Sequence, residues 1–385
     1  MAEERYRMFV LGAGFSRSAG LPLASDLWNE VRNRASRMTG RAQKFHADLE
    51  DFIRYRRDCD GLVVTPDGVD FEEFLGYLDV EFILGLRGSD TWSADGNETQ
   101  VLVKTLIGQI ITERTPQPHA IPSPYLRFAE RLQPNDHILT FNYDVLLERA
   151  LERVGKPYRL FPKRYRVAVN GGAEIDTSRK EVIVSKLHGS VDWFNREQYS
   201  RNLETRVGIG FRDLPSDAVF NNPAIQTSPL LEGPRFPGDP LLEMHRVRNI
   251  ETLYANPPLF LATPWLLNPS SLKVLYASTV KQLWQGLGHD GVANLGMVIV
   301  GFSLPTHDDY ARQVLYRIVK NYQSLYWEKG ILGRRKAPLR LVDFRCTSTE
   351  AQSLRSRYAF IDWDKATCHF NGFDEAVVPS LFDET

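Results

Sequence analysis

The chain has 385 residues, of which 43% are hydrophobic and 25% charged, as is typical of a globular protein with one elaborated domain or two. Its 47 Lys and Arg residues nearly balance its 48 Asp and Glu residues, so no overall basic field attracts nucleic acid. The three cysteines lack Cys-x-x-Cys spacing and indicate neither a disulfide framework nor a cysteine zinc site. Without a signal-peptide pattern or an apolar run of transmembrane length, a cytoplasmic location without membrane contact is expected.

The first predicted element is an apolar strand that runs into a Gly-x-Gly turn, at Met8–Ser16. Such a turn brings backbone N–H groups and the positive end of a helix towards an anion. Glycine at Gly12 and Gly14 would permit a tight turn and the close approach of a phosphate oxygen, because it has no Cβ. The six-residue glycine fingerprint is incomplete, so the turn alone does not identify the nucleotide fold.

Helical periodicity dominates residues 26–132. Because this block interrupts an α/β pattern, we expect it to form an inserted helical subdomain. Residues 1–25 and 133–385 would then form the α/β core. Within that core, residues of about 195–256 are rich in Pro, Asn, Gly and Arg, and are expected to form a loop-rich second insertion.

Apolar strands return in the second half of the chain. The predicted strands are 136–141, 182–187, 258–262, 295–300 and 339–343, and the predicted helices are 145–154, 272–287 and 308–322. Apolar strands that alternate with helices indicate a parallel sheet covered on both faces. The expected fold class is therefore α/β, with a Rossmann-like parallel sheet, helices on both faces and the inserted helical subdomain.

Four strand ends carry polar residues of kinds that catalysis uses. They are the motifs Gly12–Ser16, Thr140–Asp144, Leu187–Ser190 and Gly301–Leu304. Ligands of parallel sheets bind at the carboxyl ends of the strands, so we expect the motifs to meet at one edge. Asn142 or His188 alone has an ordinary structural explanation, such as a helix cap, but packing alone does not explain the set.

Taken in order, these motifs resemble the sirtuin superfamily. The similarity is closest to the prokaryotic sirtuin-like branch associated with anti-phage defence, which favours Thr-Phe-Asn-Tyr-Asp and Leu-His-Gly-Ser. The resemblance covers about residues 6–22, 136–194 and 295–345. Deacylating sirtuins also carry an aromatic-Arg pair, replaced here by Leu23–Ser25, and a four-cysteine zinc module that this chain lacks. No metal is therefore expected, and protein deacylation is disfavoured.

The resemblance implies cleavage of the nicotinamide–ribose bond of NAD, through a transition state similar to an oxocarbenium ion. NAD is then a substrate. Asn142 would hold a ribose hydroxyl and orient the attacking water, and His188 would act as a base. The residues expected to contact NAD are Gly12, Ala13, Gly14, Phe15, Ser16, Asp144, Gly301, Ser303 and Asp343.

Some assignments from the residues stay open. Asp144 could cap a helix instead of ordering the nicotinamide side, and Asp343 could lie at the surface instead of binding the adenosine ribose. Asp308 and Asp309 are interpreted as helix N-terminal residues favoured by the dipole. His307 is assigned no role.

The resemblance further implies an NADase effector that depletes NAD during infection and is restrained until triggered. It implies self-association and a co-encoded partner such as a HerA-like ATPase or an Argonaute, since the chain has no Walker motif of its own. Three other functions remain: a sensor that binds NAD or ADP-ribose without turnover, a protein deacylase or ADP-ribosyltransferase, and a nucleic-acid enzyme, which the neutral charge disfavours.

Overall fold

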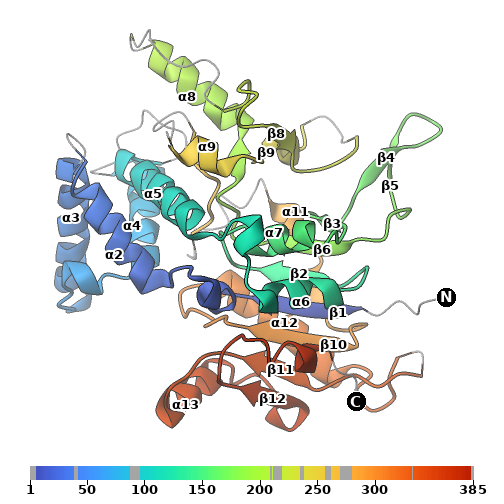
Figure 1. Cartoon of the computed structure of the whole chain (residues 1–385). Coiled ribbons are helices and arrows are strands. Elements are labelled where there is room, and N and C mark those ends of the chain that lie inside the picture. The colour runs from blue at the N-terminus through green and yellow to red at the C-terminus, as the bar shows by residue number, and fades with distance from the viewer. Residues whose placement is uncertain are drawn as a thin grey trace.

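A computed structural model describes residues 6–38, 42–86, 96–208, 210, 219–234, 238–255, 262–268, 280–331 and 333–382. Its centre is a seven-stranded sheet in which every pair of neighbouring strands is parallel. Helices lie on both sides of this sheet (Figure 1), so the predicted Rossmann-like α/β fold class is confirmed.

The sheet is built around a fully buried central strand. Across the sheet the order is β12 (Ala366–His369), β11 (Leu339–Val342), β10 (Gly296–Val300), β1 (Arg7–Leu11), β2 (His137–Thr140), β6 (Val182–Lys186) and β3 (Tyr158–Arg159). Four of the predicted strands are confirmed as β2, β6, β10 and β11. The edge strands β3 and β12 were not predicted, because they are short and only partly apolar. Most of the predicted strand 258–262 lies outside the described residues.

Between β1 and β2 the described chain is helical. The elements are α1 (Ala13–Ser16), η1 (Arg17–Ala19), α2 (Ala24–Ala35), α3 (Ala42–Asp60), η2 (Pro66–Gly68), α4 (Phe71–Leu84), α5 (Glu98–Arg114), η3 (Pro118–Ala120) and α6 (Ser123–Arg131). Trp28 of α2 packs against Phe45 and Phe74 of α3 and α4, whereas Phe128 of α6 packs edge-on against Phe9 of β1. One apolar core joins these helices to the sheet. The boundary of a separate subdomain at 26–132 therefore stays a prediction.

The rest of the chain adds the outer elements. They are α7 (Leu146–Arg153), β4 (Tyr165–Val167), β5 (Ala173–Ile175), β7 (Trp193–Asn195), α8 (Arg196–Gly208), β8 (Thr227–Pro229), η4 (Pro240–Glu243), β9 (Met244–Val247), α9 (Ile250–Ala255), α11 (Lys281–Trp284), η5 (Leu287–His289), α12 (Asp309–Ser324), α13 (Ser348–Arg357), η6 (Trp363–Lys365) and η7 (Pro379–Leu381). The predicted helices at 145–154 and 308–322 are confirmed as α7 and α12. Most of the helix predicted at 272–287 lies outside the described residues.

The segment expected to be rich in loops, 195–256, contains more regular structure than predicted. Its strands β8 and β9 join β7 in a small antiparallel sheet, and α8 and α9 flank that sheet. Met244 and Val247 of β9 are buried, which explains why a short strand forms within a polar segment. Of the helices that the structure describes, none is both long enough and apolar enough to cross a bilayer.

Candidate active site

The four polar motifs surround one cavity of about 610 Å³ at the carboxyl ends of the central strands. Parallel pairing of β10, β1, β2 and β6 brings their carboxyl ends to the same edge, as the sequence predicted. The predicted site residues that line the cavity are Ala13, Gly14, Ser16, Asn142, Asp144, His188, Gly301, Ser303 and Asp343. Gly12 and Phe15 are the two predicted site residues that are not among its lining residues.

The glycines of the first motif are explained by backbone packing. A Cβ on Gly12 would lie 2.5 Å from Phe302 Cα, and one on Gly14 would lie 2.7 Å from Gly301 Cα. The Gly12 N–H donates to Val300 O at 3.0 Å, and the Gly14 N–H donates to Gly301 O at 2.9 Å. These two N–H groups join the first motif to the end of β10 and to the start of the fourth motif. They are therefore already engaged within the protein, rather than directed at a phosphate as the sequence suggested.

Phe15 belongs to the apolar core rather than to the cavity wall. Its ring packs against Tyr125 at 5.2 Å and Phe373 at 4.7 Å between centroids, and it is almost fully buried. In the single turn of α1 the side chain of Phe15 packs against Tyr125 and Phe373, whereas Ser16 lines the cavity. Phe15 thus anchors the turn that carries Ser16.

Asn142 has one polar side-chain atom for which the described part of the chain provides no partner. Its Nδ2 donates to the Ser16 hydroxyl at 3.1 Å, which joins the second motif to the first. Its Oδ1 is buried and accepts no hydrogen bond from the residues that the structure describes. The residue is only 8% exposed and lines the cavity. A buried carbonyl oxygen without a donor is costly, so this atom is suited to accept a hydrogen bond from a ligand.

The imidazole ring of His188 is positioned by a carboxylate and by an aromatic ring. Nε2 lies 2.8 Å from Asp308 Oδ2, and the ring packs edge-on against Phe141 with centroids 4.9 Å apart. Phe141 in turn stacks on Phe302 at 4.2 Å. The left-handed conformation of Gly189, with φ of +80°, lets the chain pass so close to Trp265 that a Cβ would lie 2.0 Å from its carbonyl oxygen. The imidazole is therefore fixed beside the cavity.

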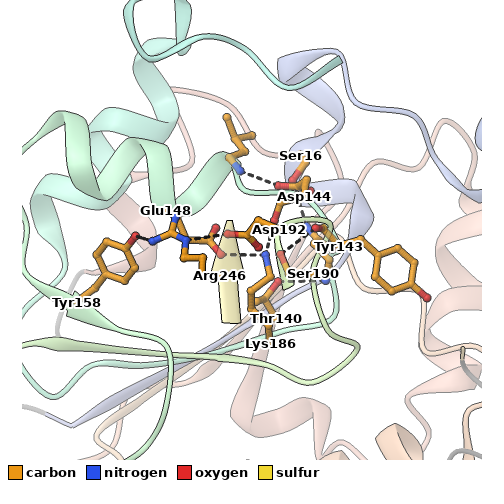
Figure 2. A network of polar contacts seen from close by, with 12 residues as sticks. Ser16, Thr140, Tyr143, Asp144, Glu148, Tyr158, Lys186, Ser190, Asp192 and Arg246 are labelled. Carbon is orange, nitrogen blue, oxygen red and sulfur yellow. Dashed lines mark hydrogen bonds and ion pairs between the residues drawn. The ribbon is translucent and has the colours of Figure 1, made fainter. Parts of the chain in front are cut away.

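A network of polar contacts links residues of the second and third motifs to neighbouring side chains (Figure 2). The Lys186 ammonium donates to the backbone carbonyl of Asp144 and to Glu148 Oε1, the latter at 2.9 Å. Burial raises the pKa of the Glu148 carboxyl despite the nearby ammonium. Further out, Arg246 donates to Asp192 at 2.7 Å. The turn that follows β2 is thus tied to the strand that precedes His188.

The two other acidic site residues differ in their roles. Asp144 Oδ1 accepts the Leu146 N–H at 3.0 Å, so Asp144 does cap the start of α7, while it also lines the cavity. Asp343 lines the cavity and is 9% exposed, which rules out the surface alternative. Burial raises the pKa of Asp343 in spite of Arg345, whose Nη2 lies 3.4 Å from its Oδ1.

Several lining residues were missed from the sequence. They are Arg17, Trp28, Glu72, Phe141 and Arg345. Asp308, interpreted only as a helix N-terminal residue, contacts His188 as well. Trp28 and Glu72 come from the helical block between β1 and β2, whose place against the sheet no local pattern shows. Arg17 directly follows the first motif, and its position there was the only sequence signal.

His307, to which the sequence assigned no role, forms an ion pair with Glu72, which lines the cavity. Its Nε2 lies 2.9 Å from Glu72 Oε2. Burial is the largest single influence and lowers the pKa of His307. The hydrogen bond to Glu72 and the nearby carboxylate charges together outweigh burial, so the pKa of His307 is raised. Ligand atoms of His307, Asp70 and Glu73 lie within 4.8 Å of one another, a spacing that could hold a cation. Asp70 already caps α4 and His307 already pairs with Glu72, so both have structural partners.

Comparison with known proteins places a family match over two of the motifs. The family described as SIR2-like domain matches residues 136–217, which include Thr140–Asp144 and Leu187–Ser190. Among solved structures, Sir2Tm bound to a propionylated peptide has a TM-score of 0.35 and 13% identity, covering 98% of this chain and 91% of that chain. A Sir2 homologue mutant in complex with ADP-ribose has a TM-score of 0.37 and 12% identity, covering 99% and 92%. Among curated proteins, none matches this chain.

Proposed function

We propose that this protein hydrolyses NAD to nicotinamide and ADP-ribose in the cavity between the four motifs. The observation that carries the proposal is the convergence of Asn142 and His188 on one cavity. Within the described ranges of the chain, no donor reaches the buried Asn142 Oδ1. The SIR2-like match over residues 136–217 and the resemblance of the motifs support NAD as the substrate.

The polar groups at the site fit the demands of this reaction. Asn142 Oδ1 accepts a hydrogen bond from a ribose hydroxyl, while its Nδ2 stays on Ser16 and fixes the amide orientation. The bond between ribose C1′ and the pyridinium nitrogen breaks, both electrons go to the nitrogen, and nicotinamide leaves as a neutral molecule. A water molecule then forms the new bond to C1′, and His188 accepts a proton from that water.

The remaining lining residues fit the rest of a dinucleotide. Arg17 and Arg345 line the cavity and provide positive charge for a pyrophosphate. Asp343 is suited to accept hydrogen bonds from the adenosine ribose. Ser16 and Ser303 add hydroxyl groups along the same wall. Ala13, Gly14 and Gly301 bring backbone close to the ligand without bulky side chains.

Nicotinamide release tests this proposal. Purified protein incubated with NAD is expected to release nicotinamide and ADP-ribose, measured by chromatography, and His188→Ala is expected to lower the rate at least ~10²-fold. His289→Ala is the matched control, because His289 lies in η5 and is not a cavity residue. No release with any tested partner, combined with saturable NAD binding, would contradict hydrolysis and favour the sensor function.

Label transfer separates hydrolysis from a transferase. A protein ADP-ribosyltransferase would leave the adenosine label of NAD on protein, whereas a hydrolase leaves it on free ADP-ribose. A deacylase would release nicotinamide only with an acylated peptide. We propose hydrolysis over both because the site presents an imidazole and an amide towards the cavity, and because the cysteine zinc module of deacylating sirtuins is missing.

The biological setting proposed for this activity rests on the resemblance alone. We propose a cytoplasmic effector of anti-phage defence that self-associates and acts with a co-encoded partner, such as a HerA-like ATPase or an Argonaute. An unrestrained NADase would exhaust the cell's own NAD, so its activity should rise when the partner is added. Mass measurement in solution, with and without the partner, tests the assembly.

A further inference from the structure

Asp308, which lies just beyond the fourth motif in the chain, contacts the histidine of the third motif. It lies 120 residues from His188 in the chain and is fully buried immediately before α12. Its two carboxylate oxygens have different roles. Oδ1 accepts the Ala311 N–H at 3.0 Å and caps α12, whereas Oδ2 lies 2.8 Å from His188 Nε2.

We propose that Asp308 is a positioning residue that keeps the His188 proton on Nε2, so that Nδ1 is the nitrogen that accepts a proton during catalysis. This inference rests on the proposed hydrolase function. An ionised carboxylate can only accept hydrogen bonds, so the nitrogen facing it must carry hydrogen. In a neutral imidazole the other nitrogen is then the basic one.

Helix capping alone does not account for a carboxylate at this position. A cap needs one acceptor oxygen, which Ser, Thr or Asn supplies equally well. A fully buried carboxylate is costly unless its charge is compensated, and here the N-terminus of α12 and the imidazole compensate it. The Glu72 carboxyl, paired with His307, adds a nearby negative charge, which makes an uncompensated Asp308 still less favourable.

Two aromatic side chains restrict the orientation of the His188 ring. The centroids of the Phe141 and Tyr143 rings lie 4.9 and 6.2 Å from the centroid of the His188 ring. These neighbouring rings restrict the rotation of the imidazole. The Tyr143 hydroxyl is itself held by Leu267 O at 3.0 Å. Asp308 therefore selects the tautomer while the two rings hold the ring plane. The same division of labour, in a serine protease, makes Asp-to-Asn replacement costly through the wrong tautomer.

Two substitutions separate positioning from capping. Asp308→Ser retains a capping oxygen but cannot reach His188, and Asp308→Asn retains the cap but presents an N–H donor to Nε2. Both are expected to lower kcat by roughly 10²- to 10⁴-fold, with KM within about threefold. Asp309→Asn, an exposed neighbour in the first turn of α12, is the matched control and should keep wild-type kcat. Wild-type kcat in both Asp308 variants would overturn the proposal.

A spectroscopic readout keeps the inference testable if the protein does not hydrolyse NAD. In protein labelled with ¹⁵N-histidine, at a pH where the imidazole is neutral, His188 should show hydrogen on Nε2, and its signal is assigned by its loss in His188→Gln. Asp308→Asn should move the hydrogen to Nδ1. If wild-type His188 carries hydrogen on Nδ1, or if Asp308→Asn leaves the tautomer unchanged, Asp308 is only a helix cap. Absent turnover with the expected tautomers would contradict the hydrolase and not the pairing.

Discussion

The two edges of the central sheet use polar residues in opposite ways. At the amino edge, Arg7 at the start of β1 pairs with Asp136 just before β2 through two hydrogen bonds of 3.0 and 2.7 Å. The Gln133 N–H also donates to Asp136. At the carboxyl edge, Asn142 has a buried oxygen that accepts no hydrogen bond from any residue that the structure describes. The polar groups of the first edge are paired with one another, whereas the second edge holds a buried oxygen for which we propose a ligand as the partner.

Breaking the amino-edge pair should have the largest effect, and only on stability. Arg7→Ala would leave Asp136 buried without its cation, which is expected to cost about 3–5 kcal/mol of unfolding free energy. Turnover per folded molecule should be unchanged, because the pair lies at the other edge from the cavity. Chemical denaturation measures the first quantity and nicotinamide release the second.

A double variant sharpens this test. Replacing Arg7 by Met together with Asp136 by Leu removes both charges, and most of the lost stability should return. A loss below about 1 kcal/mol in Arg7→Ala alone would show that the amino edge does not depend on this pair.

The carboxyl edge should behave in the opposite way. Asn142→Ala removes the acceptor proposed for the ribose hydroxyl, and turnover is expected to fall roughly 10²- to 10³-fold, as for loss of one aligned group in a transition state. The unfolding free energy should change by less than about 1 kcal/mol, since the protein loses only the bond to Ser16 and an unsatisfied oxygen. Thermal unfolding and nicotinamide release are measured on the same samples. A large loss of stability with normal specific activity would reverse the interpretation of this edge.

The contrast also shows what the sequence could and could not predict. The convergence of the Asn142 and His188 motifs followed from strand type alone, because buried parallel strands place all their carboxyl ends together. The pairing of His188 with Asp308 did not follow, because Asp308 has a sufficient local explanation as the cap of α12. The sequence indicates only the local role of Asp308, which is to cap α12. Its contact with His188 is visible only in the tertiary structure.

The same limit applies to the helical block and to the first turn. Glu72 reaches the cavity because the start of α4 lies beside the segment that precedes α12, where His307 Nε2 is 2.9 Å from Glu72 Oε2, and no periodicity in α4 specifies that placement. Phe15 follows two cavity residues in sequence, yet a single helical turn directs it into the aromatic core. The sequence suggested that a phosphate oxygen approaches Gly12 and Gly14. In the structure, the group that approaches these glycines is the backbone of residues 301–302.

The smallest expected effect concerns a compensating pair at the amino edge. His137, at the start of β2, lies with Nδ1 3.8 Å from Asp290 Oδ2. Burial, aided by Arg159, lowers the pKa of His137 from 6.5 to about 4, and burial raises the pKa of Asp290 from 3.8 to about 6. Near pH 5 the folded protein thus holds both groups neutral.

The two groups should change stability with pH in opposite directions. Between pH 6.5 and 4 the unfolded chain protonates His137 and the folded chain does not, so the His137 contribution falls as the pH falls. Over pH 6 to 4 the folded chain protonates Asp290 and the unfolded chain does not, so the Asp290 contribution rises as the pH falls. Because the two contributions change in opposite directions over the same pH range, they offset one another in the wild type.

Single variants separate the pH-dependent stability contributions of His137 and Asp290, which offset one another in the wild type. Relative to wild type, His137→Gln should gain stability as the pH falls from 6 to 4, and Asp290→Asn should lose it, as measured by urea denaturation across that range. Turnover at neutral pH should be the same in both variants, because neither residue lies at the cavity. Parallel stability curves for the two variants would mean that the pair does not titrate as its burial requires. An equal change in turnover would mean that the two edges are coupled, which would contradict the separation between stabilising and ligand-binding polar groups.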